Sequence, residues 1–391
     1  MKVLILSDLD SRLKWGLSYA FFLKKYYKIT IYCKEKNLSQ FQNYCLNEYN
    51  ILKYHDLKFL LEQNNIFQNY DLILLSLGGG ENIKFFYYLN RFYDKYKIRP
   101  LVITGMNGLT DSNDTHALLC RIGADLICIN SLDNLQGFRQ KMFLLGLSDK
   151  RLFYSGYGRL YNQNKILHNS EIKTILFIEQ PGIPKHIKQR EYLAEKIVKY
   201  VNKYPLRRLI IKKRLILHKQ HMNIYLKDDT IFDYFVKNKI NIPNNLVFDD
   251  SPIEKLMYQS DLCISFYSTG IIEAIALGIR SIVIKDFGIG RSSENHHFIG
   301  SGLLTSLDDW IDDKIPNVNQ EWKRNNCEII NESIVMSLKF LIEKLKTSKI
   351  ERASIFYNEK DFPYFYNFLY RKNKVKVFMR KCIGSFCNFF K

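Results

Sequence analysis

The chain alternates short apolar runs with longer stretches in which apolar residues recur every three or four positions. Short apolar runs bounded by turn residues are typical of strands buried on both faces, and the longer periodic stretches are typical of amphipathic helices. A regular alternation of the two predicts a parallel sheet with helices on both faces. The pattern therefore indicates an α/β protein.

This pattern occurs twice. In the first half we expect strands at 3–7, 28–33, 72–77, 100–105 and 125–130, with helices at 17–25, 57–63, 83–95 and 117–122. In the second half we expect strands at 174–180, 208–213, 246–250, 261–266 and 280–286, with helices at 187–202 and 270–277. Residues 151–170 lose the periodicity and are predicted to be a linker. The prediction is two Rossmann-like, doubly wound domains, 1–160 and 168–330, that face each other across a cleft, followed by C-terminal helices with a basic-aromatic tail at 331–391.

The charge balance points to an anionic partner. Lys and Arg number 58 against 39 Asp and Glu, a net charge of +19. Such a surplus favours nucleic acid, an acidic membrane face, or a phosphorylated or acidic sugar. No nucleic-acid-binding motif is present and the basic residues are dispersed, so a nucleic-acid-binding protein is only an alternative and no nucleic-acid partner is expected.

The spacing of the cysteines and the length of the apolar segments indicate in which cellular compartment the protein is expected. The eight cysteines form no CxxC pair, so neither a zinc site nor a disulfide framework is expected, and cysteines inside apolar runs are predicted to be buried thiols. The short apolar run of MKVLILSDLD, which ends in acids, is not expected to act as a signal peptide, and no apolar stretch of about 20 residues is uninterrupted. We expect a cytoplasmic protein. The terminal sequence RKNKVKVFMRKCIGSFCNFFK, with seven Lys/Arg and no acid, suits peripheral contact with an anionic membrane at its inner face; packing of its Phe residues on the first domain is the alternative.

Ligands of open α/β sheets bind outside the carboxyl ends of the strands, so the loops there are the candidates for chemistry. After the first strand, Asp8 and Asp10 offer a general base, and helix capping by Asp10 or Ser11 is compatible with that role. After the fourth strand, Asp111 is another candidate, with Asp114 and His116 close by, and helix capping explains these acids equally well. The acceptor side would be shaped by Lys14, Trp15, Gly105 and Asn107.

The strongest signal lies in the second half, where an apolar strand runs into Ser268-Thr269-Gly270 and a helix of small residues. Hydroxyls and backbone amides at a helix N-terminus bind phosphate. Glu273, about one turn further, would accept a hydrogen bond from a ribose hydroxyl. A simple N-cap explains Ser268 alone but explains the whole string less easily.

A basic strand end accompanies it. Lys212 and Arg214 point to the same side of a strand because side chains alternate, and with His221 they form a candidate anion clamp. A solvated basic edge that blocks strand pairing is the alternative. Gln180, after the first strand of this half, would line the cleft.

The twin α/β domains, the Ser-Thr-Gly-x-x-Glu string and LGIRSIVIKDFG after it look like a GT-B glycosyltransferase. The Ser/Thr pair with an upstream basic/His element is similar to bacterial sialyltransferases and capsule transferases, and that resemblance implies that Ser268 and Thr269 contact the nucleotide phosphate while His221 assists. The stretches RPLVITGMNGLTD, GADLICINS, FIEQPGIP, LVFDDSPIEKLMYQSDLCISFYSTGIIEAIALG and GSGLLTSLDD also resemble bacterial surface-polysaccharide glycosyltransferases. The resemblance covers most of residues 1–305. The D/E-D/E-Gly motif is absent, so the base stays open among Asp8, Asp10, Asp111 and Asp114.

These observations predict a glycosyltransferase of capsule or lipooligosaccharide synthesis that moves a sugar from a nucleotide donor to a bacterial surface glycan or glycolipid by direct displacement. A cleft carboxylate would take the acceptor proton, and the cations and helix end would stabilise the departing phosphate. The preferred donor is a CMP-activated sialic acid or related acidic sugar, because the charge surplus suits an acidic substrate. A UDP-sugar donor and a nucleotide-sugar epimerase of the same architecture are the alternatives. No cofactor and no metal are expected.

Overall fold

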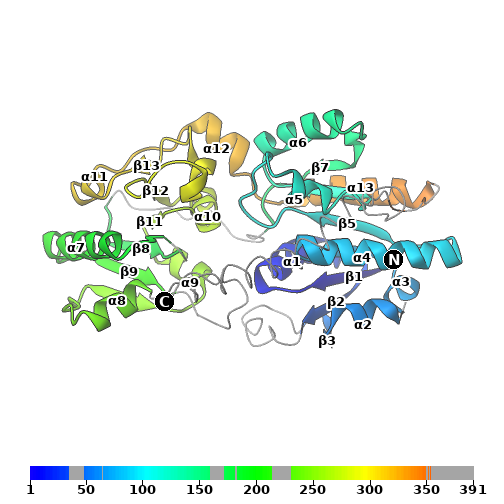
Figure 1. Cartoon of the computed structure of the whole chain (residues 1–391), viewed down its shortest axis with the longest axis horizontal. Coiled ribbons are helices and arrows are strands. Elements are labelled where there is room, and N and C mark those ends of the chain that lie inside the picture. Colours follow the sequence, from blue (N-terminus) through cyan, green and yellow to red (C-terminus); the bar gives the residue numbers. More distant parts are fainter. Residues whose placement is uncertain are drawn as a thin grey trace, which may run out of the picture. The chain divides into compact units, whose positions relative to one another are not determined.

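The computed structural model describes residues 1–34, 48–63, 65–158, 171–180, 183–213, 230–348, 351 and 353. The chain divides into two compact units (Figure 1). Unit 1 comprises residues 1–130, 134–158 and 330–391, and unit 2 comprises 131–133 and 159–329. The described residues of the region expected at 331–391, namely 331–348, 351 and 353, lie in unit 1.

In the described part of unit 1, seven parallel strands form one sheet in the order β3-β2-β1-β4-β5-β6-β7. Their bounds are β1 (Lys2–Ser7), β2 (Lys28–Lys34), β3 (Asn50–Tyr54), β4 (Leu72–Ser76), β5 (Leu101–Gly105), β6 (Leu126–Ile129) and β7 (Leu152–Tyr154). Ile5 in β1 is paired with Ile31 on one side and with Leu74 on the other, so its side chain is enclosed. The doubly wound prediction is confirmed, while β3 was not expected and β7 lies within the predicted linker.

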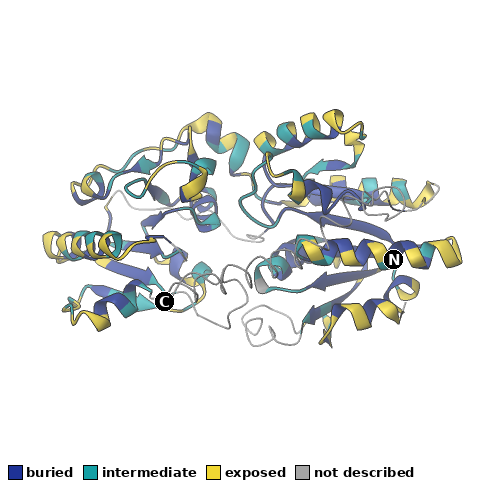
Figure 2. Ribbon diagram, viewed as in Figure 1, coloured by how far each residue is buried: buried dark blue, intermediate teal, exposed yellow. Residues whose placement is uncertain are grey.

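Helices cover the sheet of unit 1 and leave their polar sides exposed (Figure 2). Their bounds are α1 (Asp10–Leu23), α2 (Leu57–Glu62), α3 (Asn65–Asn69), α4 (Gly79–Tyr96), α5 (Thr115–Leu119), α6 (Leu132–Leu144) and α13 (Glu332–Thr347), with the 3-10 turn η3 (Asp149–Arg151) before β7. Alternate strand residues such as Leu6 and Leu75 pack with Phe85 of α4 in one core. The C-terminal α13 is tied to the segment after α1, where Tyr27 donates to Glu343 Oε1 at 2.5 Å and Lys25 pairs with Glu332 at 3.1 Å.

The described part of unit 2 holds a second parallel sheet, of six strands in the order β10-β9-β8-β11-β12-β13. The strands are β8 (Thr174–Ile178), β9 (Arg208–Lys212), β10 (Leu246–Asp249), β11 (Leu262–Ser265), β12 (Arg280–Ile284) and β13 (Leu304–Thr305). The helices are α7 (Ile187–Lys203), α8 (Ile231–Lys237), α9 (Ile253–Tyr258), α10 (Thr269–Leu277), α11 (Leu307–Ile311) and α12 (Gln320–Asn326), with 3-10 turns η4 (Arg291–Ser293) and η5 (His296–Phe298). Every strand expected in this half is present, and β13 is additional.

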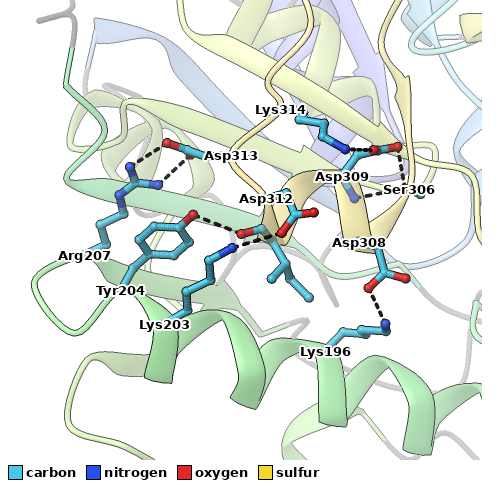
Figure 3. A network of polar contacts seen from close by, with 11 residues as sticks. Lys196, Lys203, Tyr204, Arg207, Ser306, Asp308, Asp309, Asp312, Asp313 and Lys314 are labelled. Atoms are coloured by element: carbon cyan, nitrogen blue, oxygen red, sulfur yellow. Dashed lines mark hydrogen bonds and ion pairs between the residues drawn. The ribbon is translucent and has the colours of Figure 1, made fainter.

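A row of ion pairs joins α7 and the loop that follows it to α11 and the residues after it (Figure 3). Arg207 binds Asp313 through two bonds of 2.6 and 2.8 Å, and Lys203 pairs with Asp312 at 3.0 Å. Beneath the pairs, Trp310 stacks on Tyr200 with ring centroids 4.1 Å apart. Apolar stacking inside and charge pairing outside therefore fix the two helices together.

The cysteines within the described ranges are free and buried: Cys33, Cys120, Cys128, Cys263 and Cys327. Burial was predicted for those in apolar runs, such as Cys128 and Cys263. Burial raises the pKa of the Cys33 thiol to about 12 and that of Cys120 to about 11, so these thiols stay protonated at neutral pH. No group of three or more His, Cys, Asp or Glu side chains suited to a metal occurs among the residues that the structure describes. Nor is any helix in that part of the chain long and apolar enough to cross a membrane.

Candidate functional site

The strand order of unit 1 reverses at β1 and β4, because β2 and β3 extend to one side and β5 to β7 to the other. At such a switch point the loops after the two central strands leave to opposite faces of the sheet and open a crevice that binds ligands. Asp8 follows β1 and Gly78 follows β4, and the Gly78 N–H donates to Asp8 Oδ2 at 3.2 Å. Of the predicted acids, Asp8 therefore lies at the switch point.

Arg12 accompanies Asp8. Its Nη1 donates to Asp8 Oδ2 at 2.6 Å, and a Cβ placed on Gly78 would lie only 2.9 Å from the same nitrogen. The guanidinium thus lies across the start of α4, whose N-cap, Gly78, supplies no side-chain cap. Arg12 was not among the residues predicted for the site. Its position four residues after Asp8 could have indicated the contact, because side chains at this spacing meet on a helix.

The first helix begins earlier than expected. It starts at Asp10 rather than near residue 17, and its N-cap is Leu9, so the predicted cap by Asp10 or Ser11 is wrong. Asp10 is the first residue of α1, where an acid is favoured by the helix dipole; its side chain lies outside the described residues. Lys14, one turn further, is half-buried.

The loop after β5 is held by buried side chains. Asn130 is fully buried and donates to the Gly108 carbonyl at 2.6 Å, and Arg121 Nε donates to the Gly105 carbonyl at 2.9 Å. The amide oxygen of Asn134 accepts from the Ser112 N–H at 3.1 Å. In the sequence Asn130 is only a polar residue before a helix, so its role in holding this loop was not predicted.

Asp111 and Asp114, the acids of this loop, accept hydrogen bonds from its backbone. Asp111 Oδ1 accepts from the Asn113 N–H at 2.8 Å, and Asp114 Oδ1 accepts from Ala117 N–H at 3.1 Å and so caps α5. The capping interpretation is confirmed for Asp114, and Asp111 stabilises the turn before it. Asn107, predicted for the acceptor side, is half-buried on the same loop.

Trp15 belongs to the core of unit 1. It is 1% exposed, and a Cβ on Gly105 would lie 2.5 Å from its ring. A Cβ on Gly158 would lie 2.9 Å from Trp15 Cδ1, on another part of the ring. The expected contact of Trp15 with an acceptor is therefore corrected: the ring supports the end of β5 from inside, and this close approach explains why position 105 is glycine.

The strand order of unit 2 reverses at β8 and β11. Gln180 follows β8 and Ser268 follows β11, so the predicted phosphate site coincides with the switch point of this unit. Ser268 is the N-cap of α10, and its Oγ accepts from the Gly270 N–H at 3.0 Å. A serine hydroxyl that accepts one bond still has its own hydrogen to donate to an oxygen of a ligand.

Two further residues of the Ser-Thr-Gly-x-x-Glu string are placed by packing. A Cβ on Gly270 would lie 2.9 Å from Ile178 Cδ1 and 3.0 Å from Ile253 Cδ1, so α10 begins in close contact with β8 and α9. Glu273 is only 4% exposed, and its charge adds to burial in raising the pKa of Cys263 in β11. Glu273 is therefore largely enclosed by unit 2, and the ribose contact expected of it stays a prediction.

Lys212, at the basic end of β9, forms hydrogen bonds within unit 2. Lys212 Nζ donates to the carbonyls of Lys213 and Asp250, at 2.9 and 3.0 Å, and ties the end of β9 to the loop after β10. Arg214 and His221, the other members of the predicted clamp, lie outside the described residues. Gln180 is half-buried and forms an isolated antiparallel bridge with Ile183.

One protein-family model covers most of the chain. The family model described as "Putative glycosyltransferase (DUF6716)" matches residues 3–327. None of the curated proteins matches the chain.

Among solved structures, the chain is similar to a putative UDP-N-acetylglucosamine 2-epimerase from Listeria monocytogenes, with TM-score 0.60, 11% identity and coverage of 91% of this chain and 99% of that one. The UDP-GlcNAc 2-epimerase from Neisseria meningitidis bound to UDP-GlcNAc has a TM-score of 0.54 and 13% identity, with coverage of 89% of this chain and 100% of that one. Arabidopsis thaliana UGT89C1 has a TM-score of 0.51 and 11% identity, with coverage of 89% of this chain and 95% of that one. At these identities the likeness shows the fold, which is the GT-B fold of two Rossmann-like domains.

Proposed function

Because the chain belongs to the glycosyltransferase family DUF6716, we propose that it transfers a sugar from a nucleotide-sugar donor to a bacterial surface glycan or glycolipid. The observation that carries the assignment of the donor side is the position of Ser268. It caps α10 at the switch point of unit 2, where the helix N-terminus and a hydroxyl hydrogen favour a phosphate. Thr269 begins the same helix, and Gly270 lets it approach β8.

Transfer by direct displacement needs two groups. At the donor, the bond between the anomeric carbon and the phosphate oxygen breaks, and the partial positive charge at the start of α10 stabilises the departing phosphate. At the acceptor, a carboxylate takes the proton of the attacking hydroxyl. Asp8 is our candidate for this base, because it lies at the switch point of unit 1, whereas Asp111 is engaged in a turn.

The donor we favour carries CMP and an acidic sugar, because a net charge of +19 suits an acidic substrate. A UDP-sugar is the alternative. Thermal unfolding of the full chain with CMP, UDP or GDP distinguishes them: a shift with CMP supports the first, and a shift with UDP but not CMP removes it. Mass spectrometry of products from nucleotide sugars, with and without acceptor, separates transfer from epimerisation.

Ser268→Ala tests the site, with Ser306→Ala as a matched control. Both serines are N-caps in unit 2 whose hydroxyls accept from a backbone N–H at 3.0 Å, so both substitutions cost about 1 kcal/mol of stability. Ser268→Ala should lose most of the nucleotide-induced shift, and Ser306→Ala should keep it. Equal shifts in both variants would remove Ser268 from the donor site.

A further inference from the structure

The end of α6 exposes large apolar side chains in a fixed geometry. Gly146, with φ 66°, donates to the Phe143 carbonyl at 3.0 Å, and the Leu147 N–H donates to the Met142 carbonyl at 2.8 Å. This pair of bonds is the arrangement that commonly closes helices. It turns Met142 into the core at 1% exposed and leaves Phe143 at 82% and Leu144 at 80%. The exposure of both side chains therefore follows from well-ordered backbone.

Neighbouring connections add to this surface. Every helix-to-strand connection of a parallel sheet lies at the edge where the strands begin. Ile98, which is 63% exposed, lies in the connection before β5, and Leu145 lies in the connection before β7. Hydrogen bonds join these connections: Arg99 binds Asp125 ahead of β6, and Arg151 Nη1 donates to the Ile122 carbonyl at 2.8 Å. We define the amino-edge patch as Lys97, Ile98, Phe143, Leu144, Leu145 and Lys150.

The patch is basic as well as apolar. Exposed cations in the described segments 94–98 and 139–150 are Lys95, Lys97, Arg139 and Lys150, and the exposed carboxylates are Asp94 and Asp149. Arg139 pairs with Asp149 at 3.4 Å. Apolar side chains ringed by surplus cations fit an anionic, partly apolar surface better than they fit another protein with the same charge.

The last described residues, Glu351 and Ala353, lie at this same edge. The Glu351 carbonyl accepts from Arg99 Nε at 2.8 Å, and Ala353, 5% exposed, packs in the core of unit 1. The sequence after it, 354–391, contains eight Lys/Arg, two acids and twelve Phe or Tyr. Because this sequence and the patch carry the same sign of charge, they repel each other, and both are attracted to an anionic surface.

We propose that the amino-edge patch docks unit 1 on an anionic lipid bilayer, with Phe143 and Leu144 in the interfacial region and Lys97 and Lys150 among the headgroups. Amphipathic surfaces of this kind bind through buried apolar area together with attraction to anionic lipid.

Docking at this edge has a consequence that rests on the proposed function. Asp8 and the loop after β5 lie at the opposite edge of the sheet, and the five residues of β5 span about 17 Å. A lipid-linked acceptor would therefore be a glycan long enough to extend away from the headgroups, so acceptors of several sugars should be better substrates than a single lipid-linked sugar.

Sedimentation of the full chain with phosphatidylcholine vesicles, with and without phosphatidylglycerol, tests the docking surface. We expect the chain to sediment only with vesicles that contain phosphatidylglycerol. The double substitution Phe143→Ser/Leu144→Ser should weaken this binding by about tenfold or more, where each tenfold corresponds to ~1.4 kcal/mol of binding free energy. The control is Phe59→Ser/Leu206→Ser, which replaces a Phe and a Leu that are 65% and 96% exposed outside the patch. The control should bind as the unsubstituted chain does.

Three results would overturn the proposal: no sedimentation with anionic vesicles, an equal loss in the control, or a patch variant that changes only the oligomeric state. The last result would assign the patch to contact between copies of the chain. The patch variant should keep its thermal shift with nucleotide, so failure of docking and failure of the proposed donor site give different results.

Discussion

Replacing Gly270 by alanine is the sharpest test of how α10 is placed. The new Cβ would lie 2.9 Å from Ile178 Cδ1 and 3.0 Å from Ile253 Cδ1. Carbon atoms pack at about 3.5–4.0 Å, so the start of α10 or the two isoleucines must move by roughly 0.5–1 Å. Overpacking of this kind costs about 1–3 kcal/mol of unfolding free energy.

The same movement displaces the cap. Ser268 Oγ is bonded to the Gly270 N–H, so the hydroxyl and the first amides of α10 shift together. A displacement of about 1 Å in a positioning group can cost about 100-fold in rate. We expect Gly270→Ala to bind nucleotide about tenfold more weakly or worse.

The measurements are urea unfolding and calorimetric titration with the nucleotide that stabilises the chain. Gly80→Ala is the control, because a Cβ at Gly80, in the first turn of α4, meets no atom within 4 Å. Alanine there should keep or raise stability by up to about 1 kcal/mol and leave nucleotide binding unchanged.

Two results would refute the reasoning. Unchanged stability of Gly270→Ala would show that the packing around position 270 is looser than the distances imply. Reduced stability with undiminished nucleotide affinity would show that the start of α10 does not hold the phosphate.

Three further outcomes follow from other contacts. The Arg207 hydrogen bonds lower the pKa of Asp313 below its ordinary 3.8, so the pair stabilises the fold above that pH, and this stabilisation is lost as the pH falls through the lowered pKa. Asp313→Asn should therefore lower the free energy of unfolding in urea by about 1 kcal/mol at pH 7 and by progressively less below pH 4. A loss of stability that grows as the pH falls would contradict this. Asn130→Ala should cost about 1 kcal/mol by removing the 2.6 Å hydrogen bond to the Gly108 carbonyl, which keeps its bond from the Thr110 hydroxyl at 3.1 Å. It should also raise KM for the acceptor more than for the donor, and an equal rise in both would make Asn130 purely structural. Gly146→Ala, at φ 66°, should cost about 1 kcal/mol and Gly146→Asn less, whereas equal stability of all three forms would contradict the helix closure described above.

The central strands were predictable because burial on both faces leaves an unmistakable apolar run, as in LILLS of β4, where every residue is buried. Edge strands lack that signal. β3, NILKY, has one buried residue, β7 has three residues and β13 has two, so each is defined by pairing with a neighbour rather than by its own pattern. Their positions depend on register, which the sequence does not display.

Around the candidate site, the sequence predicted structural roles that depend on neighbouring residues and missed contacts between residues far apart in the chain. Ser268 and Gly270 were identified from an apolar strand followed by small and hydroxyl residues, and both prove to shape the start of α10. Glu273 has the expected position along the helix, but α10 is buried on most sides, so spacing alone could not show which side chain reaches solvent. Asn130 was missed because its partner, the Gly108 carbonyl, is 22 residues away.

The switch points of the two units carry different chemistry. In unit 2 the crevice offers a hydroxyl and the positive end of a helix, which stabilise negative charge but take up no proton. In unit 1 it offers the Asp8 carboxylate, held by the Arg12 guanidinium and a backbone amide of α4. Glycosyl transfer by displacement needs both functions, one for the leaving phosphate and one for the acceptor proton. If Asp8 and the start of α10 have the roles proposed above, each unit supplies one of these functions, and we predict that neither unit alone transfers a sugar.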